Sequence, residues 1–300
     1  MKSIGLSLLW ALLPLLAQAE TRQFQLTPSF KGATQVQFER LASDTGTGWQ
    51  GQLQGAEGFT EALPDKCLPE RGNPEVVDAY TVDSTKPYLV VLCRWPVDHS
   101  GFDTYAIKGW EYRAFVYTWI ADALVKDEAA SQVLSGYEGN MAIYWINYHW
   151  YISRPLATQK LKERVQGRER DSLKLAQRIV LERLKAKDTE AVSSYLSLRV
   201  AQLLRDEPLT VSNAPLYNDL GYALQEASWQ ASAYELFSKV ERVVPERVVL
   251  KLNIADALWG LYKPSQAAGY YTAYIAAMQA AGKERLIPAR ALERSRGNTR

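Results

Sequence analysis

The sequence predicts an α+β protein in which an antiparallel β-rich domain precedes an α-helical domain. Between about residues 22 and 118, apolar and polar residues alternate and turn residues interrupt them, which is typical of short strands. After Arg154 and Pro155 the spacing of apolar residues changes to three and four, which is typical of helices. Further on, a pattern of residues recurs with a period of 34 positions. We therefore expect two domains, 20–154 and 155–300, behind a leader at 1–19.

The leader has the features of a secretory signal peptide. Lys2 precedes an apolar run from Ile4 to Leu16, and Ala17-Gln-Ala19 forms a small-x-small cleavage pattern. The run is shorter than the roughly 20 apolar residues that span a bilayer, so no stable membrane insertion is expected. No cysteine lies at the cleavage point, which excludes lipid attachment there. We expect a soluble periplasmic protein.

The balance of charged residues argues against nucleic acid as a partner. The 35 basic and 33 acidic side chains nearly cancel in charge, so the chain has no overall electrostatic field that would attract nucleic acid.

Export favours a disulfide between Cys67 and Cys93, the only two cysteines. On the chain-entropy model this bridge contributes on the order of 3 kcal/mol. The two cysteines and the two histidines, His99 and His149, do not have the short sequence spacings of zinc ligands. No metal and no cofactor is therefore predicted.

The strands of the first domain follow from local alternation. Val36 and Phe38 alternate with polar residues, and the loop 44–48 joins them to a second strand at 49–54 as a hairpin. Further strands are expected at 76–82, 87–95 and 112–119. The second of these three is nearly continuous in apolar residues, which predicts a central position.

Two segments close the predicted first domain. Ile120 to Leu134 has helical spacing and is followed by Gly136, so we expect a helix there. Met141 to Ile152 is expected to be a strand with aromatic residues on both faces. On that strand Trp145, His149 and Tyr151 would share one side, either as a recognition surface or as part of a core.

The second domain begins with a charged run, Lys160 to Arg170, which we interpret as the solvated face of a helix. Amphipathic helices follow around 173–184 and 191–202, and Asp188 is placed to cap the second of them. This pair lacks the 34-residue pattern, so we interpret it as a degenerate or capping unit in front of the repeats.

The repeat itself lies between Pro215 and Ala277. Four positions of its first copy are matched in class by the residues 34 positions later. These pairs are Leu220 and Ile254, Gly221 and Ala255, Ala233 and Ala267, and Phe237 and Tyr271. In the first copy the order Tyr217, Leu220, Gly221, Ala233, Phe237, Pro245 resembles the tetratricopeptide repeat family. The likeness covers about a fifth of the chain. Independently of it, apolar and small residues at spacings of three and four predict helices at 217–224, 231–243, 251–261 and 264–278.

The resemblance implies binding of another protein or peptide and names no reaction. In that family the first helix of each pair lines a concave groove. The positions that correspond here are Asn218, Tyr222, Gln225, Asp256 and Trp259. The family's basic clamp for a peptide carboxylate is not reproduced, because Leu252 and Asp256 stand where cationic or amide donors would be expected. Polar residues on this face are expected to have little packing role.

The sequence contains only weak matches to known catalytic motifs. Asp44-Thr45-Gly46 matches the nucleus of aspartic peptidase sites, but no second such turn supplies the partner carboxylate. Asp98-His99-Ser100 contains triad residue types, but neighbours on an extended chain point in different directions, so we interpret it as a turn. No glycine-rich phosphate loop or Gly-x-Ser-x-Gly motif is present.

The sequence therefore predicts an exported, non-catalytic protein that binds another protein as a scaffold or adaptor in the periplasm. Two alternatives remain. One is a periplasmic immunity protein or inhibitor that blocks a toxin or hydrolase. The other is an envelope enzyme with its site in the N-terminal domain.

The cleavage pattern gives the first testable prediction. The mature protein should begin at Glu20 and be found in the periplasmic fraction, which N-terminal sequencing checks. Recovery of a chain that still begins with Met1 from the cytosol would contradict both the predicted compartment and the argument from export for the disulfide.

Overall fold

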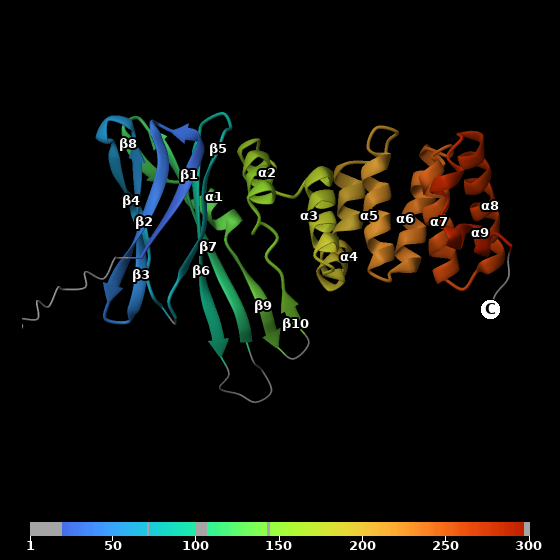
Figure 1. Cartoon of the computed structure of the whole chain (residues 1–300), viewed down its shortest axis with the longest axis horizontal. Helices are drawn as coiled ribbons and strands as arrows, with labels where there is room; N and C mark the ends of the chain where they lie inside the picture. Colours follow the sequence, from blue (N-terminus) through green and yellow to red (C-terminus); the bar gives the residue numbers. More distant parts are fainter. Residues whose placement is uncertain (1–19, 71, 100–106, 143–144, 297–300) are drawn as a thin grey trace, which may run out of the picture. The chain divides into compact units, whose positions relative to one another are not determined.

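The computed structural model describes residues 20–70, 72–99, 107–142 and 145–296, and it confirms the α+β class (Figure 1). The chain forms two compact units, the first ending at Asn147 and the second beginning at Tyr148. The predicted leader lies outside the described residues.

The first sheet of the N-terminal unit has four antiparallel strands in the order β1-β2-β3-β4. They are β1 (Thr21–Phe30), β2 (Ala33–Ser43), β3 (Gly46–Gly55) and β4 (Thr60–Cys67). Alternation in β2 buries Val36 and Phe38 and leaves their polar neighbours more exposed. Ser43 pairs with Gly46 across the turn, which confirms the predicted hairpin.

The second sheet has the order β10-β9-β7-β6-β5, and β8 also pairs with β7. The strands are β5 (Glu75–Val82), β6 (Tyr88–His99), β7 (Ile107–Ile120), β8 (Ala123–Lys126), β9 (Gly136–Ala142) and β10 (Trp145–Asn147). Six consecutive residues at the start of β6 are buried, and β6 lies between two other strands. The predicted central strand is thus confirmed.

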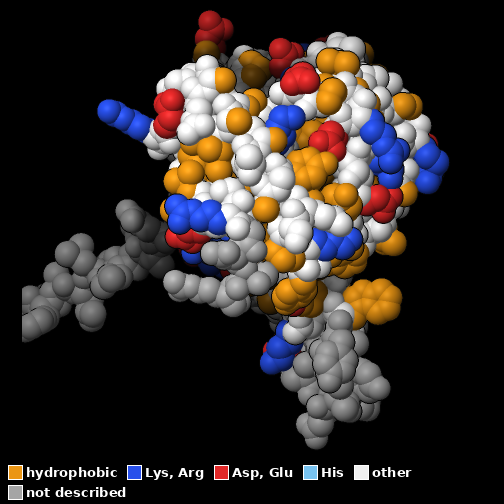
Figure 2. Space-filling model, turned by 90° about the vertical axis from the view of Figure 1, so that its right-hand side faces the viewer, with side chains coloured by type: hydrophobic (Ala, Val, Ile, Leu, Met, Phe, Trp, Pro, Cys, Tyr) orange, Lys and Arg blue, Asp and Glu red, His pale blue; other side chains and the backbone are white. Residues whose placement is uncertain are grey.

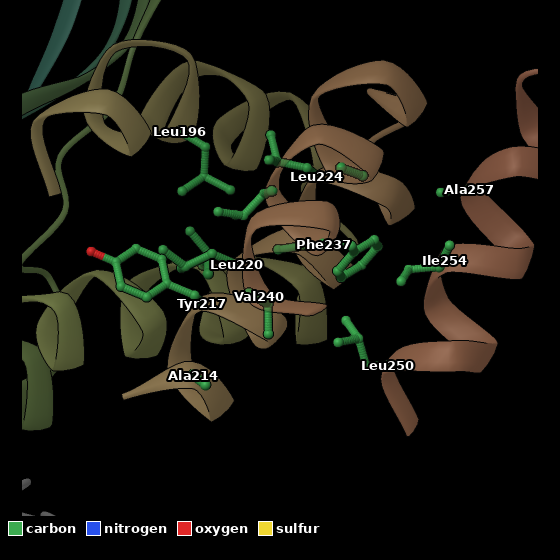
Figure 3. Packing of buried hydrophobic residues seen from close by; sticks show 14 of the residues in the cluster. Leu196, Ala214, Tyr217, Leu220, Leu224, Phe237, Val240, Leu250, Ile254 and Ala257 are labelled. Atoms are coloured by element: carbon green, nitrogen blue, oxygen red, sulfur yellow. The ribbon is translucent and has the colours of Figure 1, made fainter. Parts of the chain in front are cut away.

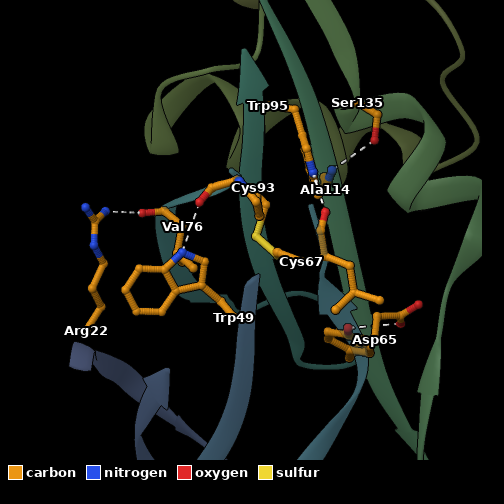
Figure 4. Close-up of a disulfide and its surroundings, with 12 residues drawn as sticks. Arg22, Trp49, Asp65, Cys67, Val76, Cys93, Trp95, Ala114 and Ser135 are labelled. Carbon is orange, nitrogen blue, oxygen red and sulfur yellow. Dashed lines mark hydrogen bonds between the residues drawn. A yellow bond between two sulfur atoms is a disulfide. The ribbon is translucent and has the colours of Figure 1, made fainter. Parts of the chain in front are cut away.

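The two sheets share one core, and the disulfide joins them. Cys67 on β4 and Cys93 on β6 form the bond, with their Cα atoms 6.5 Å apart (Figure 4). A tryptophan from each sheet lies buried beside it. The indole of Trp49 donates to the carbonyl oxygen of Pro74 at 3.0 Å, and that of Trp95 donates to the carbonyl oxygen of Leu68 at 2.7 Å. The bridge fits an oxidising compartment.

The helix predicted over 120–134 is wrong in its first half. β8 pairs with β7 there, and the helix α1 (Glu128–Leu134) begins only after Asp127. The Asp127 carboxylate accepts a hydrogen bond from the backbone N–H of Ala130 at 3.1 Å, which fixes the start of the helix. Pairing with a neighbouring strand overrides the local helical spacing.

The single strand predicted over 141–152 is also wrong. β9 and β10 form a hairpin that ends at Asn147, and the segment from Tyr148 to Ile152 is not a strand. Trp145 is 72% exposed, whereas His149 is buried and belongs to the helical unit. These two side chains do not share one side of a strand, because tertiary contacts of the aromatic residues with the helices decide their positions.

The helical unit contains paired helices. They are α2 (Arg154–Val165), α3 (Leu173–Lys185), α4 (Thr189–Asp206), α5 (Ala214–Glu226), α6 (Gln230–Val243), α7 (Val248–Gly260), α8 (Pro264–Ala280) and α9 (Ala289–Arg294). The predicted helices correspond to α3 through α8. Asp188 caps α4 by accepting from the backbone N–H of Ala191 at 3.1 Å, and Pro264 lies in the first turn of α8, both as predicted. No helix of the described residues is long and apolar enough to cross a membrane.

The charged run 160–170 is not simply a solvated face. Lys160 and Glu163 of α2 are buried, beside the buried Leu161. Glu163 accepts hydrogen bonds from both the backbone N–H and the hydroxyl of Ser172, at 3.0 and 2.5 Å. The interpretation as a solvated face was wrong for these two residues because the buried partners of Lys160 and Glu163 come from the loop before α3.

The helices of each pair approach closely at small residues. A Cβ atom at Gly221 of α5 would lie 2.4 Å from a ring carbon of Phe237 of α6. Figure 3 shows Phe237 between α5 and the Ile254 side of α7. Ala233, like Gly221, is small and buried, so the Phe237 ring fills space that a larger residue would take.

This contact predicts opposite effects of two alanine substitutions. Gly221→Ala should lower the free energy of unfolding by about 1–3 kcal/mol, because the added methyl group overlaps the Phe237 ring. Gly269→Ala in α8, where a Cβ atom would meet nothing within 4 Å, should be neutral or stabilise by up to about 1 kcal/mol. Urea unfolding of both variants checks this, and equal effects would contradict the packing described.

Candidate functional site

The face of α5 and α7 that the family resemblance singles out carries one exposed aromatic residue. Tyr222 of α5 is 41% exposed, although its neighbour Gly221 is in the core contact. Partial burial and the nearby Glu226 carboxylate raise the pKa of Tyr222, while the positive charge of Arg290 acts in the opposite direction. Tyr222 is thus an exposed phenol whose pKa responds to an acidic residue of its own helix and to a basic residue of α9.

Asp256 of α7 is held by three partners. Its carboxylate accepts a hydrogen bond from the Tyr271 hydroxyl at 2.6 Å and pairs with Arg290 and Arg294 of α9 at 2.8 and 3.3 Å. Asp256 is itself largely buried, so these contacts fasten α9 against α7. Its packing role is therefore larger than the sequence analysis expected.

Trp259 is connected to the same cluster. The guanidinium of Arg294 lies over the Trp259 ring at 4.8 Å, and the tryptophan is only partly buried. Contacts thus link Arg290, Asp256, Arg294 and Trp259 across α7 and α9. Together with Tyr222 of α5, whose pKa is affected by the charge of Arg290, these residues are called the row. In Figure 2, which faces the α8 and α9 end of the helical unit, hydrophobic side chains lie among both basic and acidic ones.

The other two predicted positions lie deeper. Asn218 is 4% exposed, and its side-chain oxygen accepts a hydrogen bond from the Asn253 amide at 3.0 Å, which links α5 to α7. Gln225 is partly buried, and its backbone oxygen accepts from the Gln230 amide at 3.1 Å. Asp256 and Trp259 therefore both contact Arg294, Tyr222 is exposed on α5, and Asn218 lies in the contact between helices.

A second cluster, which the sequence analysis missed, is a buried ion pair. Lys160 of α2 and Asp171 pair at 2.8 Å, and each side chain is 6% exposed. The Asp171 carboxylate also accepts from the hydroxyls of Tyr151 and Tyr195, at 2.6 and 2.7 Å. Burial acts to raise the pKa of Asp171. The Lys160 charge, the hydrogen bond from Lys160 and the two tyrosine hydrogen bonds outweigh it and lower that pKa.

Burial and the Asp171 charge raise the pKa of both tyrosines, so their hydroxyls remain donors. The ring of Trp150 meets that of Tyr195 edge to face at 4.9 Å between centroids. Arg199 of α4 lies over the Tyr195 ring at 4.2 Å. Aromatic and cationic side chains therefore surround the ion pair.

One signal in the sequence could have located this cluster. Lys160 follows Leu156 and Ala157 at helical spacing and precedes Leu161, which places a lysine on the apolar face of the helix. A cation on such a face needs a buried anion. The identity of that anion, Asp171, could not be read from the sequence.

The N-terminal unit has an open cavity of about 1010 Å³, formed by β6, β7, β9 and α1. His99 and Glu111 line it, together with Tyr137. Ser100, the third residue of the Asp98-His99-Ser100 motif, lies outside the described residues. The Asp44-Thr45-Gly46 motif forms the turn of the β2–β3 hairpin.

Among the residues that the structure describes, no group of three or more His, Cys, Asp or Glu side chains could hold a metal ion. No family model matches the chain, and no curated protein matches it.

The ion pair predicts an acid-sensitive stability. Because the pKa of Asp171 is lowered on folding, its charge stabilises the native state above its ordinary pKa of about 4, and this contribution is lost as the pH falls through the lower folded value. Asp171→Asn should cost about 3–5 kcal/mol at pH 7, because Lys160 is left buried without its anion. It should also reduce the loss of stability below about pH 4.

Urea unfolding between pH 2 and pH 7 measures both effects. Asp206→Asn on the exposed part of α4 is the matched control and should change stability by no more than about 0.5 kcal/mol. Identical acid profiles for the wild type and Asp171→Asn would contradict the assignment.

Proposed function

We propose that this protein is exported to the periplasm and binds another protein through its helical unit, as a non-catalytic scaffold or adaptor. The binding surface is the row formed by Tyr222, Arg290, Asp256, Arg294 and Trp259. In this proposal the helical pairs are tetratricopeptide-like, and the row lies in their groove.

The observation that carries the proposal is the exposure of Tyr222 on α5, together with the fixed cluster of charges on α7 and α9. Aromatic and arginine side chains are enriched where proteins bind one another, because they offer a large rigid contact area together with hydrogen bonds. Asp256 holds Arg290 and Arg294 in place, so little side-chain entropy is lost when a partner binds. The surface is thus ordered before the partner arrives.

Two features support export. The N-terminal segment has the signal-peptide pattern, and the Cys67–Cys93 bond fits an oxidising compartment. The bond joins the two sheets of the N-terminal unit and lies outside the helical unit that carries the proposed surface.

The partner is to be isolated by affinity purification from the periplasm with mass spectrometry, and its affinity then measured by titration calorimetry. Tyr222→Ala should weaken binding by about 2 kcal/mol or more, which corresponds to roughly 30-fold in Kd. Trp259→Ala should also weaken binding. Because the tryptophan is partly buried, its loss can lower folding stability as well. Tyr222 is therefore the cleaner probe.

Tyr262→Ala is the matched control, because Tyr262 is 93% exposed, lies in the same unit and is outside the row. It should leave the affinity unchanged, as should His99→Ala in the N-terminal unit. A thermal melt of each variant separates folding from binding. If Tyr222→Ala folds and binds normally, while Trp229→Ala at the hollow between α4 and α6 binds weakly, the proposed surface is wrong.

The nature of the partner decides between scaffold and inhibitor. If the purified partner is a hydrolase or toxin and loses activity when bound, the protein is an inhibitor of the immunity type. The large cavity beside His99 and Glu111 favours a second candidate, an envelope enzyme with its site in the N-terminal unit. In that case His99→Ala would abolish an activity that Tyr222→Ala leaves intact.

A further inference from the structure

A polar cavity in the helical unit lies beside the buried ion pair. Its volume is about 240 Å³, whereas one water molecule takes a share of about 30 Å³ in the liquid. Tyr151 and Lys160 line it, as do Arg199 and Gln202 of α4. The cavity is thus large enough for a small chemical group, and hydrogen-bond donors surround it.

Arg199 offers unused donors to this cavity. Its guanidinium lies over the rings of Tyr195 and Trp150, at 4.2 and 5.7 Å. Stacking of this kind occupies the face of the group and leaves its N–H groups free in the plane. Among the described residues its only hydrogen bond is a long one, 3.4 Å from Nη1 to the Tyr195 carbonyl oxygen, and no carboxylate pairs with it.

Lys160 has a further donor on the same cavity. Its Nζ atom donates to the carbonyl oxygen of Glu169 and to Oδ1 of Asp171, both at 2.8 Å. An ammonium group has three N–H donors, so these two bonds leave one. Lys160 is buried, and it is one of the residues that line the cavity.

The charges around the cavity favour an anion with a single charge. Lys160, Arg170 and Arg199 line it together with Glu169 and Asp171. Lys160 pairs with Asp171 and Arg170 pairs with Asp206, so Arg199 is the lining cation without a carboxylate partner among the described residues. The Asp171 carboxylate already accepts three hydrogen bonds. A phosphate with two charges would meet these two carboxylates, whereas a planar carboxylate matches the fork of a guanidinium.

We propose that this cavity binds one carboxylate group of a ligand. The guanidinium of Arg199 holds both oxygens in its plane, and the remaining N–H of Lys160 contacts one of them. The carboxylate belongs either to a free small acid or to an acidic side chain of a polypeptide. The site is separate from the Tyr222 row and does not rest on the proposed function.

Titration of the purified chain with sodium acetate, at constant ionic strength and with ligand-observed NMR as the readout, tests the proposal. Acetate should bind saturably to the wild type. Arg199→Gln should weaken this binding by about tenfold to a hundredfold, as expected for the loss of charge-assisted hydrogen bonds. Arg205→Gln on the exposed part of α4 is the matched control and should leave binding unchanged.

Two further variants sharpen the test. Arg199→Lys keeps the charge but loses the planar fork, so its affinity should fall between those of the wild type and Arg199→Gln. Glu169→Gln removes a negative charge from the lining and should tighten binding. The proposal is overturned if acetate does not bind saturably to the wild type, or if Arg199→Gln binds it as well as the wild type does.

A pair of neutral peptides separates the two sources of the carboxylate. Acetyl-Gly-Glu-Gly-amide carries a single acidic side chain, and acetyl-Gly-Gln-Gly-amide carries none. Tighter binding of the first peptide than of acetate, lost in Arg199→Gln, assigns the site to a polypeptide side chain. Tighter binding of acetate assigns it to a free small acid. Equal binding of the Glu and Gln peptides, together with no binding of acetate, contradicts the proposal.

Discussion

The close contact of Gly221 with Phe237 is the constraint on which the helical unit depends. A Cβ atom at position 221 would overlap the ring, so α5 and α6 approach only because glycine lies there. Successive residues of a helix are rotated by about 100°, which turns Tyr222 away from this contact and leaves it exposed. The same requirement for small residues that builds the core thus decides which large side chain remains exposed. Beyond this contact, Arg290 and Arg294 hold α9 against α7 through their ion pairs with Asp256.

Most of the fold could be predicted because its signals are local. Alternation in β2, the buried run at the start of β6 and the 34-residue pattern of α5 to α8 each depend on residues close in the sequence. The predictions failed where a distant partner decides the conformation. The segment 123–126 has helical spacing but pairs with β7, and the segment 148–152 has strand-like residues but packs its aromatic rings against helices such as α4.

The sites could be predicted only in part, for the same reason. The family pattern singled out Tyr222, which is exposed. It could not show that Asn218 lies inside the contact with Asn253 or that Arg290 and Arg294 pair with Asp256. Lys160 illustrates the limit most clearly. Its place on an apolar face is visible in the sequence, whereas its anion and the two tyrosines that complete the cluster come from separate elements.

The central claim is that a partner protein binds across α5, α7 and α9. Hydrogen–deuterium exchange of the chain with and without its purified partner tests it most directly, because the amides that a partner covers exchange more slowly. The account predicts new protection in residues 214–226, 248–260 and 289–294, with little change in residues 20–147. Protection confined to residues 20–147, with exchange of α5 and α7 unchanged, would contradict it.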